Sequence, residues 1–327
     1  MEKPNDSSLK RIRLALAGDT MLGRGVAEVL VDSRPSDVIA PEVVEIAGSA
    51  DLFILNLECC ISVRGSPRPD PGKPFFFRAP PVAAELLQAI GVDCVTLANN
   101  HALDFGPVAL DDTLDLLADV GIDVVGAGRD QTEARRSSVL SHGGFSLEIM
   151  GFTDHPPEFA AGPESPGVAF ADLSSGVPAW LEKAIRSSTA DATLVTPHWG
   201  PNMTIRPVNR VKRAADALVA ARATLVAGHS AHVFHGVSDR VLFDLGDFVD
   251  DYAVDPELRN DLGLLFLIEL THDGPMELEV VPLALDYCHT RLAVGDEADW
   301  ILRRFRHACH EMGTEVSIRD GRPVIRW

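Results

Sequence analysis

Short apolar runs rich in β-branched residues alternate with longer amphipathic segments over the first two thirds of the chain. The near-continuous apolar character of these runs is typical of strands buried on both faces. It predicts strands at Ile12–Ala17, Leu52–Leu55, Val92–Leu97, Ile122–Val125, Ala192–Thr196 and Thr224–Ala227. The amphipathic segments predict helices at Pro81–Ile90, Pro107–Val120, Pro178–Ser187 and Asn209–Ala221. Strands separated by helices imply crossover connections, so the pattern predicts an α/β fold with a mostly parallel or mixed sheet covered by helices.

The pattern of apolar and polar residues changes after residue 240. The runs Val241–Leu245, Leu262–Leu270 and Met276–Leu283 have few helical segments between them and predict antiparallel strands. A helix is expected at Ala298–Met312, followed by a terminal hairpin in Gly313–Trp327. The loop Ser62–Pro80 is too long for a simple connection, and loops of this length are often functional.

Charge and composition exclude several classes of protein. The 327 residues contain 29 Lys and Arg against 48 Asp and Glu, which gives a net charge of −19. A chain this acidic repels phosphate backbones and anionic lipid surfaces, so neither nucleic acid nor membrane is an expected partner. The polar start Met1–Arg13 lacks the apolar core of a signal peptide, and a cytoplasmic location is expected. The odd count of five cysteines, without CxxC spacing, predicts reduced thiols.

Side chains able to bind metal follow five of the predicted strands. In an open α/β sheet the carboxyl ends of the strands line one crevice, so residues far apart in sequence converge there. These residues are Asp19, Glu58, Asn100, His198, His229 and His232. Each alone is more often a turn, capping or surface residue than a ligand. Together they predict a site for one or two divalent ions such as Mn²⁺, Zn²⁺ or Fe²⁺, because their donors are carboxylate, amide and imidazole rather than thiolate.

The motifs containing these residues resemble a known family. The order Gly-Asp-Thr-Met-Leu-Gly-Arg, Asn-Leu-Glu, Leu-Ala-Asn-Asn-His-Ala-Leu-Asp-Phe-Gly, His-Trp-Gly, Gly-His-Ser-Ala-His and Leu-Gly-Asp-Phe is similar to the CapA family of calcineurin-like metallophosphatases. The resemblance implies a four-layered α/β/β/α sandwich with a binuclear metal centre. It also implies a link to poly-γ-glutamate capsule synthesis, and hence γ-glutamyl or related amide chemistry. It defines a domain over residues 1–290, with a C-terminal helix and hairpin in 291–327 packed on it.

The resemblance also suggests roles for individual residues. Asp19 matches the carboxylate of the first motif, and Glu58 is similar to the bridging acid, with Asn56 beside it as an alternative. Asn100 matches the amide ligand, and His101 matches the histidine that protonates the leaving group. His198, His229 and His232 would supply imidazoles, so Asp19, His101 and His198 are the candidate catalytic residues.

Two departures from the superfamily pattern leave alternatives open. Met21 stands where the wider superfamily has a histidine ligand, so one metal position has fewer ligands and a single ion is an alternative to two. Two residues separate His229 from His232, whereas the superfamily pattern has one. The sequence therefore does not decide which of the two histidines is the ligand.

Three further residues are candidates for substrate binding. Lys73 and Arg78 resemble the family's basic loop, and both could hold a carboxylate or phosphate, although local salt bridges would also explain them. His155 could also reach the site, although a structural role is the favoured interpretation of its position.

Two functions fit these observations. The first is a metal-dependent hydrolase acting on an amide, γ-glutamyl or phosphoester bond of a small anionic substrate. The alternative is a non-catalytic assembly subunit for a capsule-like polymer such as poly-γ-glutamate. A homodimer is compatible with either function.

Overall fold

The chain folds around two β-sheets. The structure is a computed structural model that describes residues 10–32, 34–69 and 72–327. The larger sheet has ten strands and the smaller main sheet has six. Most of the polar start Met1–Arg13 lies outside the described residues, as do residues 70–71 of the loop Ser62–Pro80.

Strand β1 (Arg11–Thr20) lies at the centre of the larger sheet. It pairs in parallel with β2 (Leu52–Leu57) and antiparallel with β16 (Leu262–Thr271). Beyond these neighbours the order continues to β5 and β6 on one side, and to β17, β20 and β19 on the other, with β15 paired to β1 and β18 to β17. The bounds are β5 (Cys94–Thr96), β6 (Asp123–Val125), β15 (Asp247–Val249), β17 (Gly274–Asp286), β18 (His289–Leu292), β19 (Ser317–Arg319) and β20 (Arg322–Arg326). The sheet is therefore mixed, as predicted.

The smaller sheet has the order β13-β14-β12-β11-β9-β8. Its strands are β8 (Ser138–His142), β9 (Phe145–Thr153), β11 (Ala192–His198), β12 (Leu225–Ala227), β13 (Val237–Ser238) and β14 (Val241–Leu242). β14 runs antiparallel to β13 but parallel to β12, so the predicted antiparallel pairing near Val241 holds for one neighbour only. Two short ladders join β3 (Cys60–Ile61) to β4 (Arg78–Ala79) and β7 (Ala127–Gly128) to β10 (Gly167–Val168).

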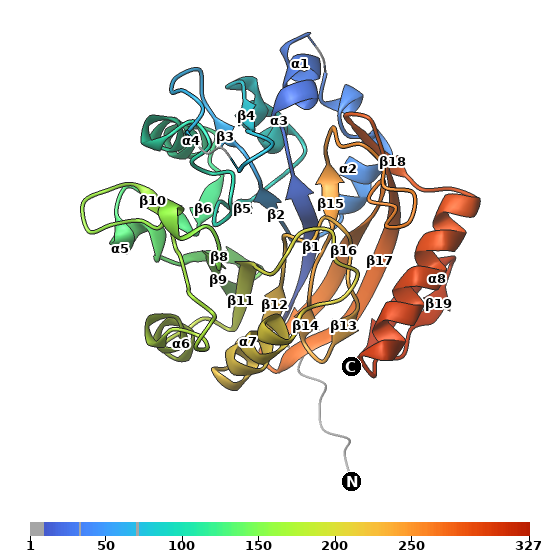
Figure 1. Cartoon of the computed structure of the whole chain (residues 1–327). Coiled ribbons are helices and arrows are strands. Elements are labelled where there is room, and N and C mark those ends of the chain that lie inside the picture. The colour runs from blue at the N-terminus through green and yellow to red at the C-terminus, as the bar shows by residue number, and fades with distance from the viewer. Residues whose placement is uncertain (1–9, 33, 70–71) are drawn as a thin grey trace.

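Three hydrophobic cores define the layers. Alternation along β1 sends Leu14 into a core between the two sheets, where it meets the layer that contains Leu194 of β11. Its neighbour Ala15 faces a second core, which packs α1 to α4 against the outer face of the larger sheet. A third core packs α6 and α7 against the outer face of the smaller sheet. Figure 1 shows these helices on opposite sides of the paired sheets, so the four-layered α/β/β/α sandwich is confirmed.

The predicted helices are present, and the structure adds others. The bounds are α1 (Arg24–Asp32), α2 (Pro41–Ala47), α3 (Val82–Ala89), α4 (Pro107–Asp119), α5 (Gln131–Ala134), α6 (Ala179–Arg186), α7 (Asn209–Ala220) and α8 (Asp296–Glu311), with 3₁₀ turns at Pro35–Asp37 and Pro157–Phe159. The sequence pattern does not predict α1, whose three valines lower its helix propensity. Packing of its apolar face against the sheet overrides that preference.

Register within the sheets places polar side chains at one edge. Asp19 near the end of β1 lies opposite Asn56 of β2 and Asp247 of β15. In the other sheet β11 ends at His198, which forms an isolated bridge with His229. The carboxyl ends of strands from both sheets therefore supply residues to one place, as the sequence predicts.

The C-terminal segment extends both the core and the larger sheet. Ile301, Phe305 and Cys309 of α8 are fully buried in the core between the sheets. β20 pairs with β17, and the hairpin turns at Asp320 and Gly321, both with positive φ. These contacts support our proposal that residues 291–327 fold together with 1–290. Within the described ranges, no helix is long and apolar enough to cross a bilayer.

The packing of Phe305 generates a stability prediction. Its ring lies 6.3 Å from that of Phe234 and 6.5 Å from that of Phe266, and the side chain is fully buried. Phe305→Ala should lower the free energy of unfolding by about 3–5 kcal/mol, because it removes apolar contacts and leaves a cavity. Urea denaturation measures this change. Ile318→Ala, at a side chain that is 46% exposed, is the control and should change stability little.

Candidate metal centre

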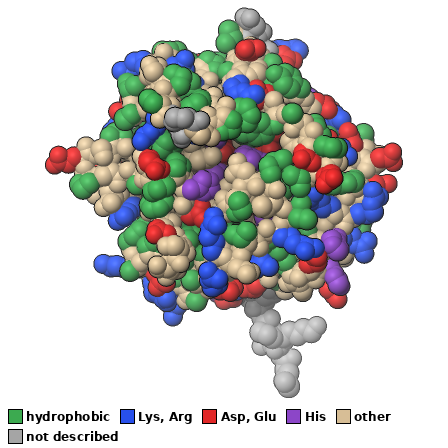
Figure 2. Space-filling view, viewed as in Figure 1, with side chains coloured by type: hydrophobic (Ala, Val, Ile, Leu, Met, Phe, Trp, Pro, Cys, Tyr) green, Lys and Arg blue, Asp and Glu red, His purple; other side chains and the backbone are tan. Residues whose placement is uncertain are grey.

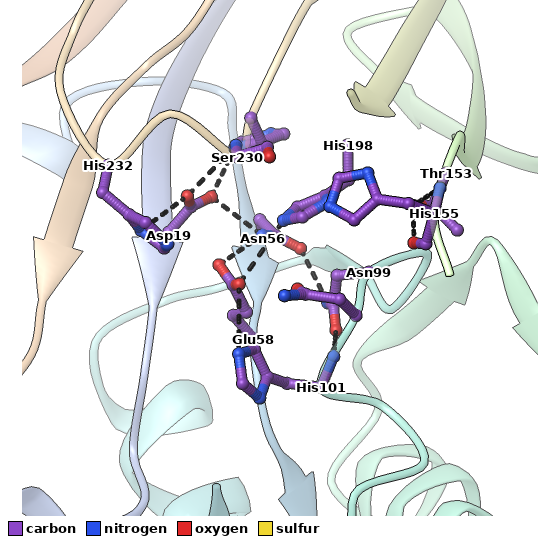
Figure 3. Close-up of polar contacts among 12 residues, drawn as sticks. Asp19, Asn56, Glu58, Asn99, His101, Thr153, His155, His198, Ser230 and His232 are labelled. Atoms are coloured by element: carbon purple, nitrogen blue, oxygen red, sulfur yellow. Dashed lines mark hydrogen bonds and ion pairs between the residues drawn. The ribbon is translucent and has the colours of Figure 1, made fainter. Parts of the chain in front are cut away.

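Asp19 is the buried carboxylate around which the candidate site is built. Asn56 donates from Nδ2 to Asp19 Oδ1 at 2.8 Å, and the backbone N–H of Ser230 donates to Oδ2 at 3.2 Å. Nδ1 of His229 lies 3.1 Å from Oδ1, and Nδ1 of His232 lies 3.4 Å from Oδ2. Figure 3 shows Asn56, Ser230 and His232 around Asp19.

These contacts keep Asp19 ionised. Burial alone would raise its pKa, but the hydrogen bond and charge of His229, helped by His232, hold the pKa below its ordinary value. The loop that carries both histidines is conformationally strained, since Ser230 and His232 have φ values of 110° and 57°. Such backbone is held in place only when its surroundings require it, and it is concentrated at functional sites.

Among the residues that the structure describes, two groups of potential metal ligands share Asp19. The first consists of Asp19, His232 and Asp247, and the second of Asp19, Glu58 and His198. In each group the ligand atoms all lie within 4.8 Å of one another, and every residue is buried. A carboxylate shared by two such groups could contact two neighbouring ions.

Buried polar atoms without hydrogen-bond partners show that the residues fit a metal. Among the described residues, these include Glu58 Oε1, Asn100 Oδ1, both ring nitrogens of His198 and Asp247 Oδ2. Buried polar atoms are nearly always paired, because an unpaired one costs about 1–3 kcal/mol. A divalent cation would satisfy carboxylate, amide and imidazole donors together, and this donor set suits Mn²⁺, Zn²⁺ or Fe²⁺.

The electrostatics of the site also favour a bound cation. Burial, and then the charge of Asp19, raise the pKa of Glu58 well above its ordinary value. Burial and Asp250 have the same effect on the pKa of Asp247. Burial, and then His155, lower the pKa of His198 well below its ordinary value, which leaves a neutral imidazole able to coordinate. The site thus concentrates acidic groups whose ionised form a bound cation would stabilise.

Asp247 is a candidate ligand that the sequence analysis does not identify. It lies in the Leu-Gly-Asp-Phe motif, and its Oδ1 is 2.8 Å from His232 Nδ1. The parallel pairing of β15 with β1 brings it beside Asp19. Met21, at the position where the superfamily has a histidine, is fully buried in the core under the helices. Met21 therefore cannot act as this ligand, and Asp247 would supply a carboxylate ligand from strand β15 instead.

The structure brings His229 and His232 to the same carboxylate. His232 belongs to one of the groups of mutually close ligand atoms, whereas His229 does not. His229 Nε2 lies 3.1 Å from Thr196 Oγ1, while its Nδ1 faces Asp19. The geometry favours His232 as a ligand and leaves His229 in contact with the shared Asp19.

His101 faces the same site from the loop after β5. Its Nε2 lies 3.8 Å from Glu58 Oε1, and its Nδ1 lies 2.6 Å from Asp104 Oδ2. Asn99 accepts the His101 backbone N–H at 3.0 Å and donates to Asn56 Oδ1 at 2.9 Å, which ties this loop to the residues around Asp19. Burial lowers the pKa of His101 to about 4, against the opposing effect of Asp104. Asp104 is a second site residue that the sequence analysis does not single out.

The cations of the long loop contact the protein itself. Lys73 Nζ contacts the Asp104 carboxylate and the carbonyl oxygen of Asn100. Its charge therefore faces the carboxylate that holds His101 rather than the candidate metal site. Arg78 donates from Nη1 to the carbonyl oxygen of Arg64 at 3.1 Å and stacks 4.2 Å from the Phe105 ring centroid. Direct substrate binding by Lys73 and Arg78 stays a prediction.

His155 lies at the rim, beside His198. The two ring centroids are 5.1 Å apart, and Figure 3 shows the rings side by side. Asp154, whose side chain is 3% exposed, accepts from His155 Nδ1 at 2.5 Å and lies 3.3 Å from Arg210 Nε. In Figure 2 histidine side chains are visible within a central hollow of the surface. Arg210 is a rim residue that carries no motif signal in the sequence.

We expect the protein to bind divalent metal and to unfold at a higher temperature when metal is bound. Binding to the native state alone contributes about 2.7 kcal/mol at a ligand concentration 100 times Kd. Asp247→Asn should reduce this stabilisation at a given metal concentration, because the amide lacks the carboxylate charge. Calorimetric unfolding with and without Mn²⁺ or Zn²⁺ measures the shift.

Asp273→Asn is the matched control, since that side chain is 80% exposed. It should unfold as the unmodified protein does. An undiminished metal-induced shift in Asp247→Asn would remove Asp247 from the centre.

The chain is similar in sequence to proteins named for polymer synthesis. A probable polyglutamine synthesis accessory protein from Mycobacterium tuberculosis (strain ATCC 25618 / H37Rv) is 28% identical over 362 residues, covering 94% of each chain. The PGA biosynthesis protein CapA from Bacillus subtilis (strain 168) is 28% identical over 275 residues, covering 82% of this chain and 70% of the relative.

A solved structure of a putative 5'-nucleotidase from Staphylococcus aureus, in complex with alpha-ketoglutarate, has a TM-score of 0.45 at 14% identity, covering 88% of this chain and 55% of that chain. This likeness is too distant to bear on function, and the fold assignment rests on the layers described above. Residues 13–252, which include every candidate ligand, match the model of the family described as bacterial capsule synthesis protein PGA_cap. The chain belongs to this capsule synthesis family.

Proposed function

We propose that the protein is a metal-dependent hydrolase acting on an amide or γ-glutamyl bond, or a phosphoester bond, of an anionic substrate. The observation that carries this proposal is the pair of buried ligand groups that share Asp19. A site that served only stability would not leave so many buried oxygen and nitrogen atoms without hydrogen-bond partners.

Five buried side chains would hold one or two divalent ions, and Asn100 would add its amide oxygen. These side chains are Asp19, Glu58, Asp247, His198 and His232. When bound in such a site, divalent ions act as Lewis acids and make water a stronger nucleophile at neutral pH. The residues of the chain supply the rest of the reaction: they orient the substrate and move a proton.

His101 is positioned to transfer the proton. Asp104 holds Nδ1, which leaves Nε2 directed at the site where it can protonate a leaving group. Because burial disfavours a charged imidazole, the Asp104 carboxylate is needed to stabilise the protonated ring. Phe77 donates its backbone N–H to the same carboxylate at 2.7 Å, and with Lys73 it fixes the orientation of Asp104.

The rim supplies recognition of a second negative group on the substrate. Asp154 orients both His155 and Arg210 beside His198, and within the described part of the chain the terminal guanidinium nitrogens of Arg210 make no hydrogen bond or ion pair. An arginine held in this way matches the geometry of a carboxylate or phosphate. The γ-glutamyl alternative is supported by the family and by relatives named for polyglutamine and PGA synthesis.

A second candidate function is supported by one specific observation. The mycobacterial relative is named an accessory protein, which is compatible with a non-catalytic assembly subunit that keeps the fold as a binding platform. The absence of turnover in metal-loaded protein on both an amide and a phosphoester substrate would favour this alternative.

His101→Ala should lower kcat by a factor of about 10²–10⁴, because a positioned proton donor contributes that much to the rate. Metal content should be unchanged, since His101 belongs to neither ligand group. Release of nitroaniline from γ-glutamyl-p-nitroanilide and of nitrophenol from bis(p-nitrophenyl) phosphate measures turnover on the two bond types.

Asp104→Asn should lower kcat by less than His101→Ala does and should also retain metal. Elemental analysis of each purified variant is the companion measurement. Loss of metal from folded His101→Ala would contradict the assignment of proton transfer to this residue.

Arg210→Ala should raise KM for a substrate that carries a second anionic group, and should leave kcat almost unchanged. One charge-assisted hydrogen bond contributes about 1.5–3 kcal/mol, which corresponds to a change in KM of roughly one to two orders of magnitude. Steady-state kinetics on matched anionic and neutral substrates separates binding from chemistry.

Arg213→Ala is the control, because Arg213 is an exposed arginine of the same helix. An equal rise in KM for both substrates with Arg210→Ala would mean that Arg210 supports the loop around Asp154 rather than binding substrate.

A further inference from the structure

Three aromatic side chains from distant segments contact one another beside the candidate metal centre. Phe75 and Phe77 belong to the long loop before α3, and Tyr252 lies just after β15; these three residues are here called the aromatic wall. The ring centroid of Tyr252 lies 5.7 Å from that of Phe75 and 5.9 Å from that of Phe77. The fold therefore assembles an aromatic surface that neither segment could form alone.

The aromatic wall ends at two residues of the candidate site. Tyr252 packs edge to face against the candidate ligand His232, with ring centroids 5.4 Å apart. Phe77 packs in the same way against His101, with ring centroids 4.7 Å apart. Burial, and then the charge of Glu58, raise the pKa of Tyr252, which agrees with a hydroxyl close to the buried carboxylates. The wall is thus continuous with the metal centre.

The other end of the wall reaches the surface. Phe77 is fully buried and Tyr252 is partly buried, whereas Phe75 is 41% exposed. Figure 2 shows hydrophobic side chains that border the hollow in which histidines are visible. An exposed aromatic ring that continues into a site is a surface that part of a bound ligand can cover.

Arg24 holds the exposed ring in place. Its guanidinium carbon lies 4.4 Å from the ring centroid of Phe75 and 5.5 Å from that of Phe77. Arg24 Nε lies 3.2 Å from Asp251 Oδ2, and Gly25 donates its backbone N–H to the same oxygen at 3.0 Å. A cation fixed in this way orders the ring that it covers, so a ligand that packs on Phe75 would lose little affinity to ordering of this side chain.

The site presents a different chemistry beside His198. There the rim carries His155 and Arg210, both held by the buried Asp154. Charge on this side and aromatic surface beside His101 and His232 would contact different parts of one substrate. An anionic group suits the rim, and an apolar group suits the aromatic wall.

We infer that the aromatic wall binds a flat, apolar leaving group of the substrate, with Phe75 and Tyr252 supplying the contact surface. The inference rests on the proposed function, because it is His101 that would protonate the leaving group. A group that takes a proton from His101 would lie beside Phe77 and could extend along the wall toward the surface. Aromatic side chains bind such groups by burying apolar surface and by offset or edge-on ring contacts.

The test is isothermal titration calorimetry of the Mn²⁺-loaded, full-length protein with phenylphosphonate and with methylphosphonate. The two ligands share the anionic group that would contact the metal and differ in the ring. Neither is cleaved, so the result does not depend on turnover. We expect phenylphosphonate to bind roughly tenfold more tightly, because its ring would bury apolar surface against the wall.

Phe75→Ala should weaken the binding of phenylphosphonate by at least about threefold and leave that of methylphosphonate unchanged, because it removes the exposed ring of the wall. Phe75→Tyr keeps a ring and should restore the preference. Since Phe75 is 41% exposed, both variants should fold normally. Met276→Ala is the matched control, because that apolar side chain is 42% exposed and lies near the start of β17. It should bind both ligands as the unmodified protein does.

The outcomes separate this inference from the proposed function. Equal affinity of the unmodified protein for the two phosphonates would overturn the inference and leave the metal centre intact. A preference for phenylphosphonate that Phe75→Ala does not reduce would also overturn it. Equal weakening of both ligands in Phe75→Ala would give Phe75 a structural role and overturn it as well. Binding of neither ligand to the metal-loaded protein would contradict both the inference and the proposed function.

Discussion

The site depends on one buried charge, the carboxylate of Asp19. It lies at the end of the central strand of the larger sheet, and it contacts an amide from β2, a backbone N–H and two histidines from the loop after β12. A buried carboxylate is tolerated only with such partners, since an uncompensated one would take up a proton. Any cation in the centre would therefore be held against a charge that the fold itself keeps ionised.

The sandwich gives this charge its neighbours. Glu58 follows β2 in one sheet, and His198 ends β11 in the other, yet Glu58 Oε1 and His198 Nε2 are 3.4 Å apart. Only the packing of the two sheets through their shared core brings these ends together. The stability of that core and the geometry of the metal centre are therefore linked, although no residue of the core takes part in the chemistry.

The rim of the candidate site carries basic side chains in a protein whose net charge is −19. The rim around His155 and Arg210 presents a small basic area beside the buried ligands, which suits one end of an anionic substrate.

The sequence by itself determined the α/β class, the central strands and most helices, because apolar periodicity reports which residues are buried. It also identified Asp19, Glu58 and His198 as neighbours, because strand ends in an open sheet meet at one edge. Tertiary structure alone decided the rest. Asp247 reaches Asp19 through a parallel pairing between distant segments, and Asp104 orients His101 only because the loop folds back on itself. Lys73 contacts Asp104 and the loop beside it rather than the open site, and Arg210 reaches the rim from a helix without a motif. The positions of Asp247, Lys73 and Arg210 depend on contacts between distant parts of the chain, which a local residue pattern does not encode. The contact between His101 and Asp104 spans only three residues, and it depends on the conformation of the loop.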